Sequence, residues 1–262
     1  MGEYTLKAVL TVNDGNDRTE RYMYETDCVV ELLKVNDRHA VFYDKELKMH
    51  FENKSAVTYL YRLEITDARL SFEGPSAKSE DFHRLLFFRY DGIRPHIDAG
   101  GKLIGIGNTG EAKQMWRKMR RKILSDYRGG YLETYLDLLE EEIENNRAFI
   151  GAMRRYLHFG LLFPHIPLEH PARWENKRIV EFSEYEREEF EEHAVYRETE
   201  ENIRIYDLTG TSLPGSKSRL LEYQGEIRIA ENELIPRESE ICTVSSWGQI
   251  EIGWHFRLNK KG

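Results

Sequence analysis

Histidine and carboxylate side chains at short spacing are the first residues of this sequence that could perform chemistry. His96 and Asp98 are two positions apart in the segment Arg94-Pro95-His96-Ile97-Asp98. On a β-strand such residues point to the same face, so the carboxylate could orient the imidazole for proton transfer. Pairs of this kind also occur often by chance. We therefore favour a structural role and keep His96 and Asp98 as the candidate acid–base pair.

Three further histidines, His158, His165 and His170, occur within one short segment. Histidine is a common ligand of transition metals. Their spacings of seven and five residues match neither the HExxH pattern nor the histidine pairs of zinc fingers. Pro164 and Pro167 also prevent the three from sharing one helix face. We expect ordinary surface or half-buried histidines, and these three are the candidate ligands if a metal binds.

The two cysteines, Cys28 and Cys242, lie near opposite ends of the chain and form no CxxC motif. That spacing excludes a zinc ribbon and a thioredoxin-type site. We expect two buried free thiols in a reducing compartment. One disulfide between the two ends of the chain is the alternative.

Residues 105–110 match the GxGxxG pattern between an expected strand and an expected helix. In dinucleotide sites these glycines allow the backbone to approach a pyrophosphate at the helix N-terminus. The surroundings do not fit that motif, because the preceding strands have an antiparallel pattern and a second helix follows the first. We predict a tight turn into a helix, with Asn108 and Glu111 forming a capping box, and we expect no cofactor.

The predicted helix after Asn108 carries a basic cluster around Trp116. Such a cluster could bind phosphate or an acidic protein surface. The following predicted helix has an acidic face, so we favour pairing of the two faces within the fold over an external partner. The binding candidates on the basic helix are Trp116, Arg117, Arg120 and Arg121.

An apolar stretch containing Phe159, Leu162 and Phe163 follows the helices. Packing against the strands is its first expected use. An exposed surface for a partner is the second, because an apolar patch of this size needs cover. These three residues complete the set of candidate binding residues.

The pattern of apolar residues predicts which elements must position these side chains. Alternation of apolar and polar residues predicts strands before residue 107 and after residue 200, including 4–12, 57–72 and 250–258. Helical spacing predicts two helices between 108 and 156, separated at Gly129-Gly130. The predicted class is α+β, with antiparallel strand-rich N- and C-terminal segments (1–107 and 164–262) that flank a central helical hairpin (108–163). We expect the three segments to form one compact domain.

Composition limits the function classes. The chain has 262 residues, of which 12 are Phe, 15 Tyr and 4 Trp, so it can bury a substantial core. A net charge of −8 argues against binding of nucleic acid or anionic membranes by the whole protein. Neither a signal peptide nor an apolar run of about 20 residues is visible, so we expect a cytoplasmic location unless a leader has been removed.

The nucleophile elbow, the P-loop and the kinase signature are all absent from the sequence. We therefore favour a non-enzymatic binding or interaction protein with an aromatic-rich surface: an adaptor, an inhibitor of the immunity type, or a carrier of a hydrophobic ligand. The partner would be another protein or that ligand. The alternative is an enzyme that uses His96 and Asp98, and the oligomeric state stays open.

Overall fold

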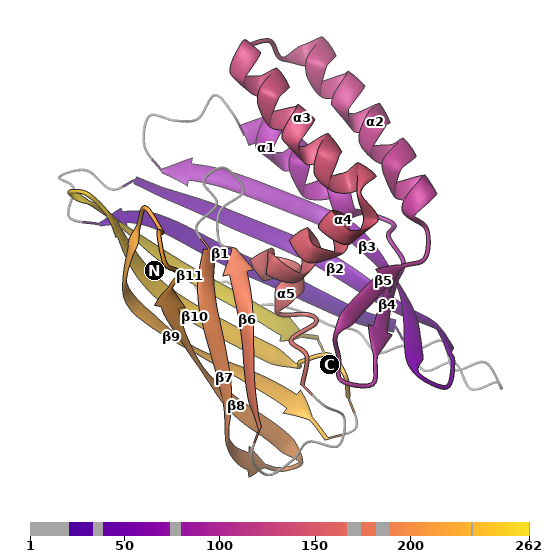
Figure 1. Cartoon of the computed structure of the whole chain (residues 1–262), viewed down its shortest axis with the longest axis vertical. Coiled ribbons are helices and arrows are strands. Elements are labelled where there is room, and N and C mark those ends of the chain that lie inside the picture. The colour runs from indigo at the N-terminus through magenta and orange to yellow at the C-terminus, as the bar shows by residue number, and fades with distance from the viewer. Residues whose placement is uncertain are drawn as a thin grey trace.

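The computed structural model describes residues 21–33, 39–73, 80–166, 174–181, 189–231 and 233–261. Within these residues the chain forms one antiparallel sheet of 11 strands, with a few helices packed against one face (Figure 1). The predicted α+β class is confirmed in this broad sense, although sheet dominates. The strand predicted at 4–12 lies outside the described residues.

Strands come from both ends of the chain, and the helices lie mainly between them in sequence. The strands before the main helical segment are β1 (Arg21–Leu33), β2 (His39–Lys54), β3 (Thr58–Glu73), β4 (Pro95–Asp98) and β5 (Leu103–Ile106). Those after it are β6 (Glu175–Glu181), β7 (Glu189–Glu200), β8 (Ile203–Ser212), β9 (Arg219–Ala230), β10 (Glu238–Trp247) and β11 (Ile250–Lys260). The helices are α1 (Glu80–Phe87), η2 (Phe88–Tyr90), α2 (Thr109–Asp126), α3 (Gly130–Glu144), α4 (Asn146–Arg155) and α5 (Leu157–Gly160).

The strand order across the sheet is β5-β4-β3-β2-β1-β11-β10-β9-β8-β7-β6. Each pair of neighbours is consecutive in the chain except β1 and β11, which join the two halves of the sheet. In that pairing Tyr24 lies opposite Lys260 and Cys28 lies opposite Phe256. The first and last described strands therefore lie side by side in the middle of the sheet (Figure 1).

The two faces of the sheet have different environments. Cys28, Phe256 and Ile241 form one cross-strand row on the inner face and are at most 4% exposed. The next row, with His255 opposite Cys242, points outward because side chains alternate along a strand. Cys28 is buried and Cys242 is exposed, and because they lie on opposite faces no disulfide joins them. The expectation that both thiols are buried is therefore wrong for Cys242.

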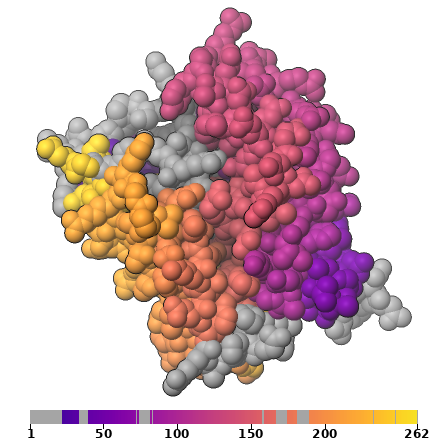
Figure 2. Space-filling model, viewed as in Figure 1, coloured from indigo at the N-terminus to yellow at the C-terminus, as the bar shows by residue number. Residues whose placement is uncertain are grey.

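The helical segment fills the space between the two halves of the sheet (Figure 2). Trp116, Phe159, Leu162 and Phe163 are between 0 and 4% exposed and belong to the core. Burial of each such side chain contributes about 1.5–3 kcal/mol to folding. Phe159, Leu162 and Phe163 are therefore core residues, which is the first of their two expected uses, and they form no exposed surface for a partner.

A buried ion pair attaches the end of the helical segment to the sheet. Glu192 on β7 is 1% exposed, and its carboxylate accepts hydrogen bonds from Arg178 Nε and Tyr223 Oη, both at 2.5 Å. Arg178 on β6 also donates to the carbonyl oxygen of Gly160 in α5. Gly210, opposite Glu192 on β8, leaves room for the Tyr223 ring, which a β-carbon there would strike. The Glu192 carboxylate therefore links three strands, and Arg178 links this group to α5.

The helical segment differs in detail from the two helices predicted. A further break occurs at Asn145, whose side chain caps α4 by accepting hydrogen bonds from the backbone N–H groups of Arg147 and Ala148. Asn108 precedes α2 but makes no side-chain cap, so the predicted capping box is wrong. Its Oδ1 accepts from Arg94 N instead, and its Nδ2 donates to Glu111. Among the helices that the structure describes, none has the length and apolar character needed to span a membrane.

Candidate ligand-binding site

His96 and Asp98 both lie on β4 and are partly buried. The Asp98 carboxylate accepts hydrogen bonds from the backbone N–H groups of Gly100 and Lys102, both at 2.9 Å, and so organises the turn into β5. His96 packs against Gly107, where a β-carbon would lie 2.7 Å from His96 Nε2. No hydrogen bond joins His96 to Asp98 within the described residues. The glycine thus makes room for a histidine ring.

Of the three candidate metal-binding histidines, the structure describes the surroundings of His165 alone. His158 lies in α5, and His170 lies outside the described residues. His165 has a positive φ of 60° and is half-buried beside Gly100 and the turn of Asp98. Burial lowers the pKa of His165, as does the positive charge of Lys102, while Asp98 opposes the shift. These surroundings favour a neutral imidazole.

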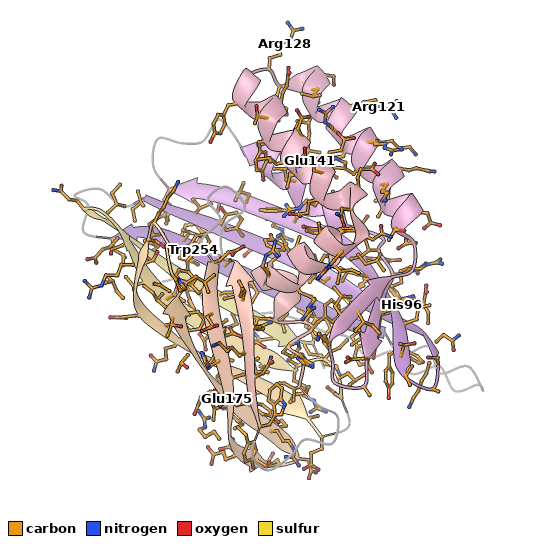
Figure 3. All side chains as sticks on the ribbon, viewed as in Figure 1. His96, Arg121, Arg128, Glu141, Glu175 and Trp254 are labelled. Carbon is orange, nitrogen blue, oxygen red and sulfur yellow. The ribbon has the colours of Figure 1, made fainter. Side chains whose placement is uncertain are left out.

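The basic face of α2 forms ion pairs with the acidic face of α3. Arg117 Nη2 lies 2.5 Å from the Glu144 carboxylate. Arg120 pairs with Asp137 and, at 2.9 Å, with Glu140. These contacts agree with pairing of the two faces within the fold. Arg121 lies on the outer edge of α2, far from His96 on β4 (Figure 3).

A pocket with a volume of about 230 Å³ opens on the inner face of the sheet, at the end where β1 begins and β11 ends. Aromatic rings from three adjacent strands form most of its wall, and the connection between β9 and β10 closes one side. The lining residues are Tyr22, Tyr24, Phe51, Lys54, Tyr59, Tyr61, Glu233, Leu234, Ile235 and Lys260.

A bulge in β2 brings both Phe51 and Lys54 into this wall. Phe51 lies opposite Tyr61 and Lys54 lies opposite Tyr59, with a register shift between the two pairs. Without the extra residue, positions 51 and 54 would face opposite sides of the sheet. The bulge therefore adds an ammonium group to an aromatic surface.

The two lysines of the pocket occupy ring faces. Lys260 Nζ lies 4.1 Å from the centre of the Tyr22 ring and 2.9 Å from Glu233 Oε1. Lys54 Nζ lies 4.8 Å from the centre of the Tyr59 ring. No carboxylate of a described residue lies within 4 Å of Lys54 Nζ. Among the lining residues that the structure describes, two ammonium groups and one carboxylate give a net positive charge.

Tyr24 supplies the pocket with a buried hydroxyl group. Its side chain is 1% exposed, and its Oη makes no hydrogen bond to any residue that the structure describes. Burial raises the pKa of Tyr24 well above its usual value, and the neighbouring Glu233 carboxylate raises it further. The hydroxyl therefore stays protonated and can donate a hydrogen bond.

The closing wall at Leu234 and Ile235 packs against the turn between β4 and β5. Gly101 in that turn has a φ of +71°, and a β-carbon there would lie 3.2 Å from the Leu234 carbonyl oxygen. Two loops more than 130 positions apart in the sequence thus meet beside the pocket.

None of the sequence motifs identified the pocket. Its residues come from four strands and one connection, so no local spacing marks them as a group. The usable signal was the pair of aromatic repeats Tyr22/Tyr24 and Tyr59/Tyr61, because residues two apart share a strand face.

Comparison with known proteins leaves the family of this chain open. No family model and no curated protein sequence matches it. Among solved structures, one described as "lipid-protein interactions in lipovitellin" is similar to this chain, with a TM-score of 0.49 and 11% sequence identity. The similar region covers 92% of this chain and 25% of the lipovitellin chain. The chain thus spans about a quarter of the length of that protein.

Proposed function

We propose that this protein binds a small amphipathic ligand, an apolar aromatic body with one carboxylate group, in the pocket between β1, β2, β3 and the β9–β10 connection. The observation that carries the proposal is the buried Tyr24 hydroxyl, which has no hydrogen-bond partner among the described residues. A buried polar group without a partner costs about 1–3 kcal/mol. A carboxylate oxygen of a ligand would remove that cost.

The volume supports a small ligand. A cavity of about 150 Å³ accommodates benzene, so 230 Å³ corresponds to an apolar body of about ten non-hydrogen atoms, the size of a naphthyl ring system. The rings of Phe51 and Tyr61 meet edge to face at 5.6 Å and present a flat apolar surface to it. This space is too small for several lipid chains.

The charge of the pocket favours an anion. The ammonium groups of Lys54 and Lys260 already lie over the Tyr59 and Tyr22 rings, where a cationic ligand would otherwise bind. A second cation would be repelled by both lysines. Glu233 already pairs with Lys260, which leaves Lys54 as the counter-ion for a carboxylate.

Calorimetric titration with 2-naphthoate tests the proposal directly. We expect a Kd of about 1–100 μM, given the usual free energy per ligand atom. The neutral 2-naphthamide should bind at least tenfold more weakly, and 2-naphthylmethylammonium should not bind. Absence of 2-naphthoate binding at 1 mM, or equal affinity for all three compounds, would overturn the proposal for this ligand class.

A pair of lysine variants locates the anion. Lys54→Gln should weaken 2-naphthoate binding about tenfold and leave 2-naphthamide unaffected. Lys48→Gln is the matched control, because Lys48 lies on the same strand in the row of Glu64, away from the pocket lining. Equal effects of both variants would show that the ligand responds to overall charge rather than to this pocket.

A further inference from the structure

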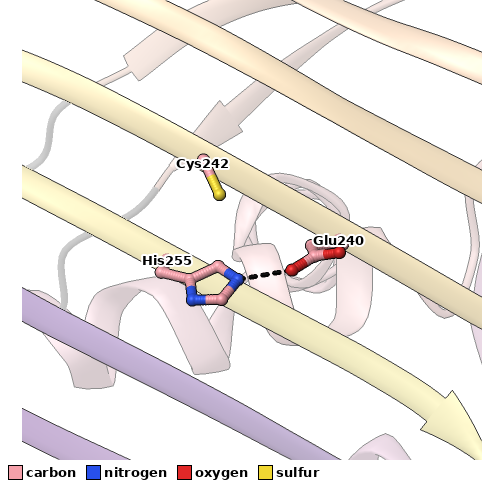
Figure 4. Close-up of side chains that lie close together, drawn as sticks. All are labelled: Glu240, Cys242 and His255. Carbon is pink, nitrogen blue, oxygen red and sulfur yellow. Dashed lines mark hydrogen bonds and ion pairs between the residues drawn. The ribbon is translucent and has the colours of Figure 1, made fainter. Parts of the chain in front are cut away.

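Three side chains that commonly bind metals lie together on the outer face of the sheet. Cys242 on β10 is directly opposite His255 on β11, and Glu240 precedes Cys242 by two positions on the same face. The helices lie on the other side of these strands (Figure 4). Cys242 and His255 are exposed and Glu240 is partly exposed, so a dissolved ion can reach all three.

The donor atoms are close enough to share one ion. One atom from each side chain lies within 4.8 Å of the other two, and His255 Nε2 is 2.6 Å from Glu240 Oε1. Zinc bonds of about 2.0–2.3 Å in a tetrahedron place the donor atoms about 3.3–3.8 Å apart. Rotation of the three side chains would bring their donor atoms from the present separations to those of a zinc site. The backbones of the two hydrogen-bonded strands would not need to move.

We propose that Glu240, Cys242 and His255 form a binding site for Zn²⁺ or a divalent ion with similar ligand preference. One thiolate, one imidazole and one carboxylate make a donor set that suits Zn²⁺ and excludes Ca²⁺ and Mg²⁺, which require oxygen donors. Three protein ligands leave the fourth position of a tetrahedron open. That position can take water or a small external ligand.

Arg257 limits the affinity of the site. Its Nη2 donates to Glu240 Oε1 at 2.9 Å, the same oxygen that meets His255. The other oxygen, Oε2, accepts no hydrogen bond from a described residue and is available to the ion. Arg257 therefore orients the carboxylate, while its positive charge opposes a second cation. We expect a Kd in the micromolar range, well above that of a closed structural zinc site.

Titration of the reduced protein with Zn²⁺, followed by calorimetry, tests the site. We expect one ion per chain in the wild-type protein. Titration with Cd²⁺ should produce the ultraviolet charge-transfer absorption of a metal–thiolate bond, on the short-wavelength side of the aromatic bands. Both measurements are independent of the pocket, which lies on the opposite face of the sheet, so failure of either proposal leaves the other intact.

Three variants separate the ligands. Cys242→Ser should abolish the thiolate absorption and weaken Zn²⁺ binding at least tenfold. His255→Ala and Glu240→Gln should each weaken Zn²⁺ binding at least tenfold. All three positions are on the surface, and unchanged thermal unfolding without metal will show that each variant folds.

The matched control is His193→Ala. His193 on β7 pairs with the carboxylates of Glu175 at 3.1 Å and Glu191 at 3.8 Å, without a cysteine. We expect no change in Zn²⁺ affinity for this variant. If Cys242→Ser leaves the affinity unchanged, or if only Cys242→Ser alters it, the site with three ligands is wrong.

Discussion

A β-carbon on Gly101 would lie 3.2 Å from the carbonyl oxygen of Leu234. The backbones of the β4–β5 turn and the β9–β10 connection are therefore so close that a larger residue than glycine at position 101 would push them apart. The contact lies beside the aromatic pocket. It holds Leu234 and Ile235 in the wall of the aromatic pocket. The shape of the pocket therefore depends on a residue that does not line it.

Gly101→Ala should lower the free energy of unfolding by about 2–3 kcal/mol, because it adds both backbone strain at positive φ and a clash. Gly215→Ala is the control, since Gly215 has a φ of +83° and open space around it. That variant should cost about 1 kcal/mol. Only Gly101→Ala should also weaken 2-naphthoate binding. Urea denaturation measures the loss of stability, and calorimetry measures the loss of affinity for 2-naphthoate. Equal losses of stability and affinity in the two variants would show that the contact between Gly101 and Leu234 does not shape the pocket.

Tyr24→Phe should separate stability from binding. The variant keeps the ring and removes the buried hydroxyl, so the free energy of unfolding should stay the same or rise by up to about 1 kcal/mol. The affinity for 2-naphthoate should fall about tenfold, because its carboxylate loses a donor. Loss of stability without loss of affinity would show that the hydroxyl has a structural partner instead.

Glu192→Ala should destabilise the fold strongly, because it leaves the Arg178 guanidinium buried without its counter-ion. Removal of one member of a buried ion pair costs about 3–5 kcal/mol. Glu191→Gln, at the neighbouring position, removes a surface carboxylate that pairs with Lys177 and should change stability by less than about 0.5 kcal/mol. Urea denaturation midpoints compare the two. Similar midpoints would mean that Glu192 does not attach α5 to the sheet.

Asp27 should make the protein less stable as the pH rises. Burial raises the pKa of Asp27 to about 6, with a further increase from the Asp44 carboxylate and a partial decrease from Arg257. The native state thus holds the proton more tightly than the unfolded chain, so stability decreases as the pH rises from about 4 to above 6.

Asp27→Asn should remove this pH dependence. At pH 7 we expect the variant to be more stable than the wild type by about 1–2 kcal/mol, allowing for residual solvation of the carboxylate. At pH 4 the two proteins should have equal stability. Urea denaturation at four pH values measures the difference in the free energy of unfolding between the variant and the wild type. If that difference does not change with pH, the ionisation of Asp27 does not cause the pH dependence.

Elements with strong periodicity were predictable from the sequence alone. The strand predicted at 250–258 corresponds to β11 (Ile250–Lys260), and the one at 57–72 corresponds to β3 (Thr58–Glu73). In both, one face is apolar and the other polar, which is the pattern of a sheet covered on one side. The full length of β2 (His39–Lys54) was harder to predict, because its second half continues to Lys54 through charged residues.

Long-range partners explain what the sequence did not predict. Lys45 on β2 is 2% exposed, and its ammonium donates to the Tyr156 hydroxyl at 2.7 Å, from a residue 111 positions away. Glu192 is buried in the same manner by partners on other strands. From the sequence alone, a charged residue within a strand predicts an exposed position. Only knowledge of its partner, which is distant in the sequence, would predict that it is buried. The pocket was missed for the same reason, since its walls come from segments near both ends of the chain.

The pairing of β1 with β11 has a consequence for how this chain reaches its fold. Tyr24 and Lys260 are opposite each other in the finished sheet but more than 230 positions apart in sequence. Every other strand pair joins consecutive strands and can form early, whereas this one must wait until both halves exist and a very long loop closes. Until then β1 and β11 are open edges, able to pair with other chains. The period before closure, and not the finished sheet, is when this protein is most exposed to aggregation.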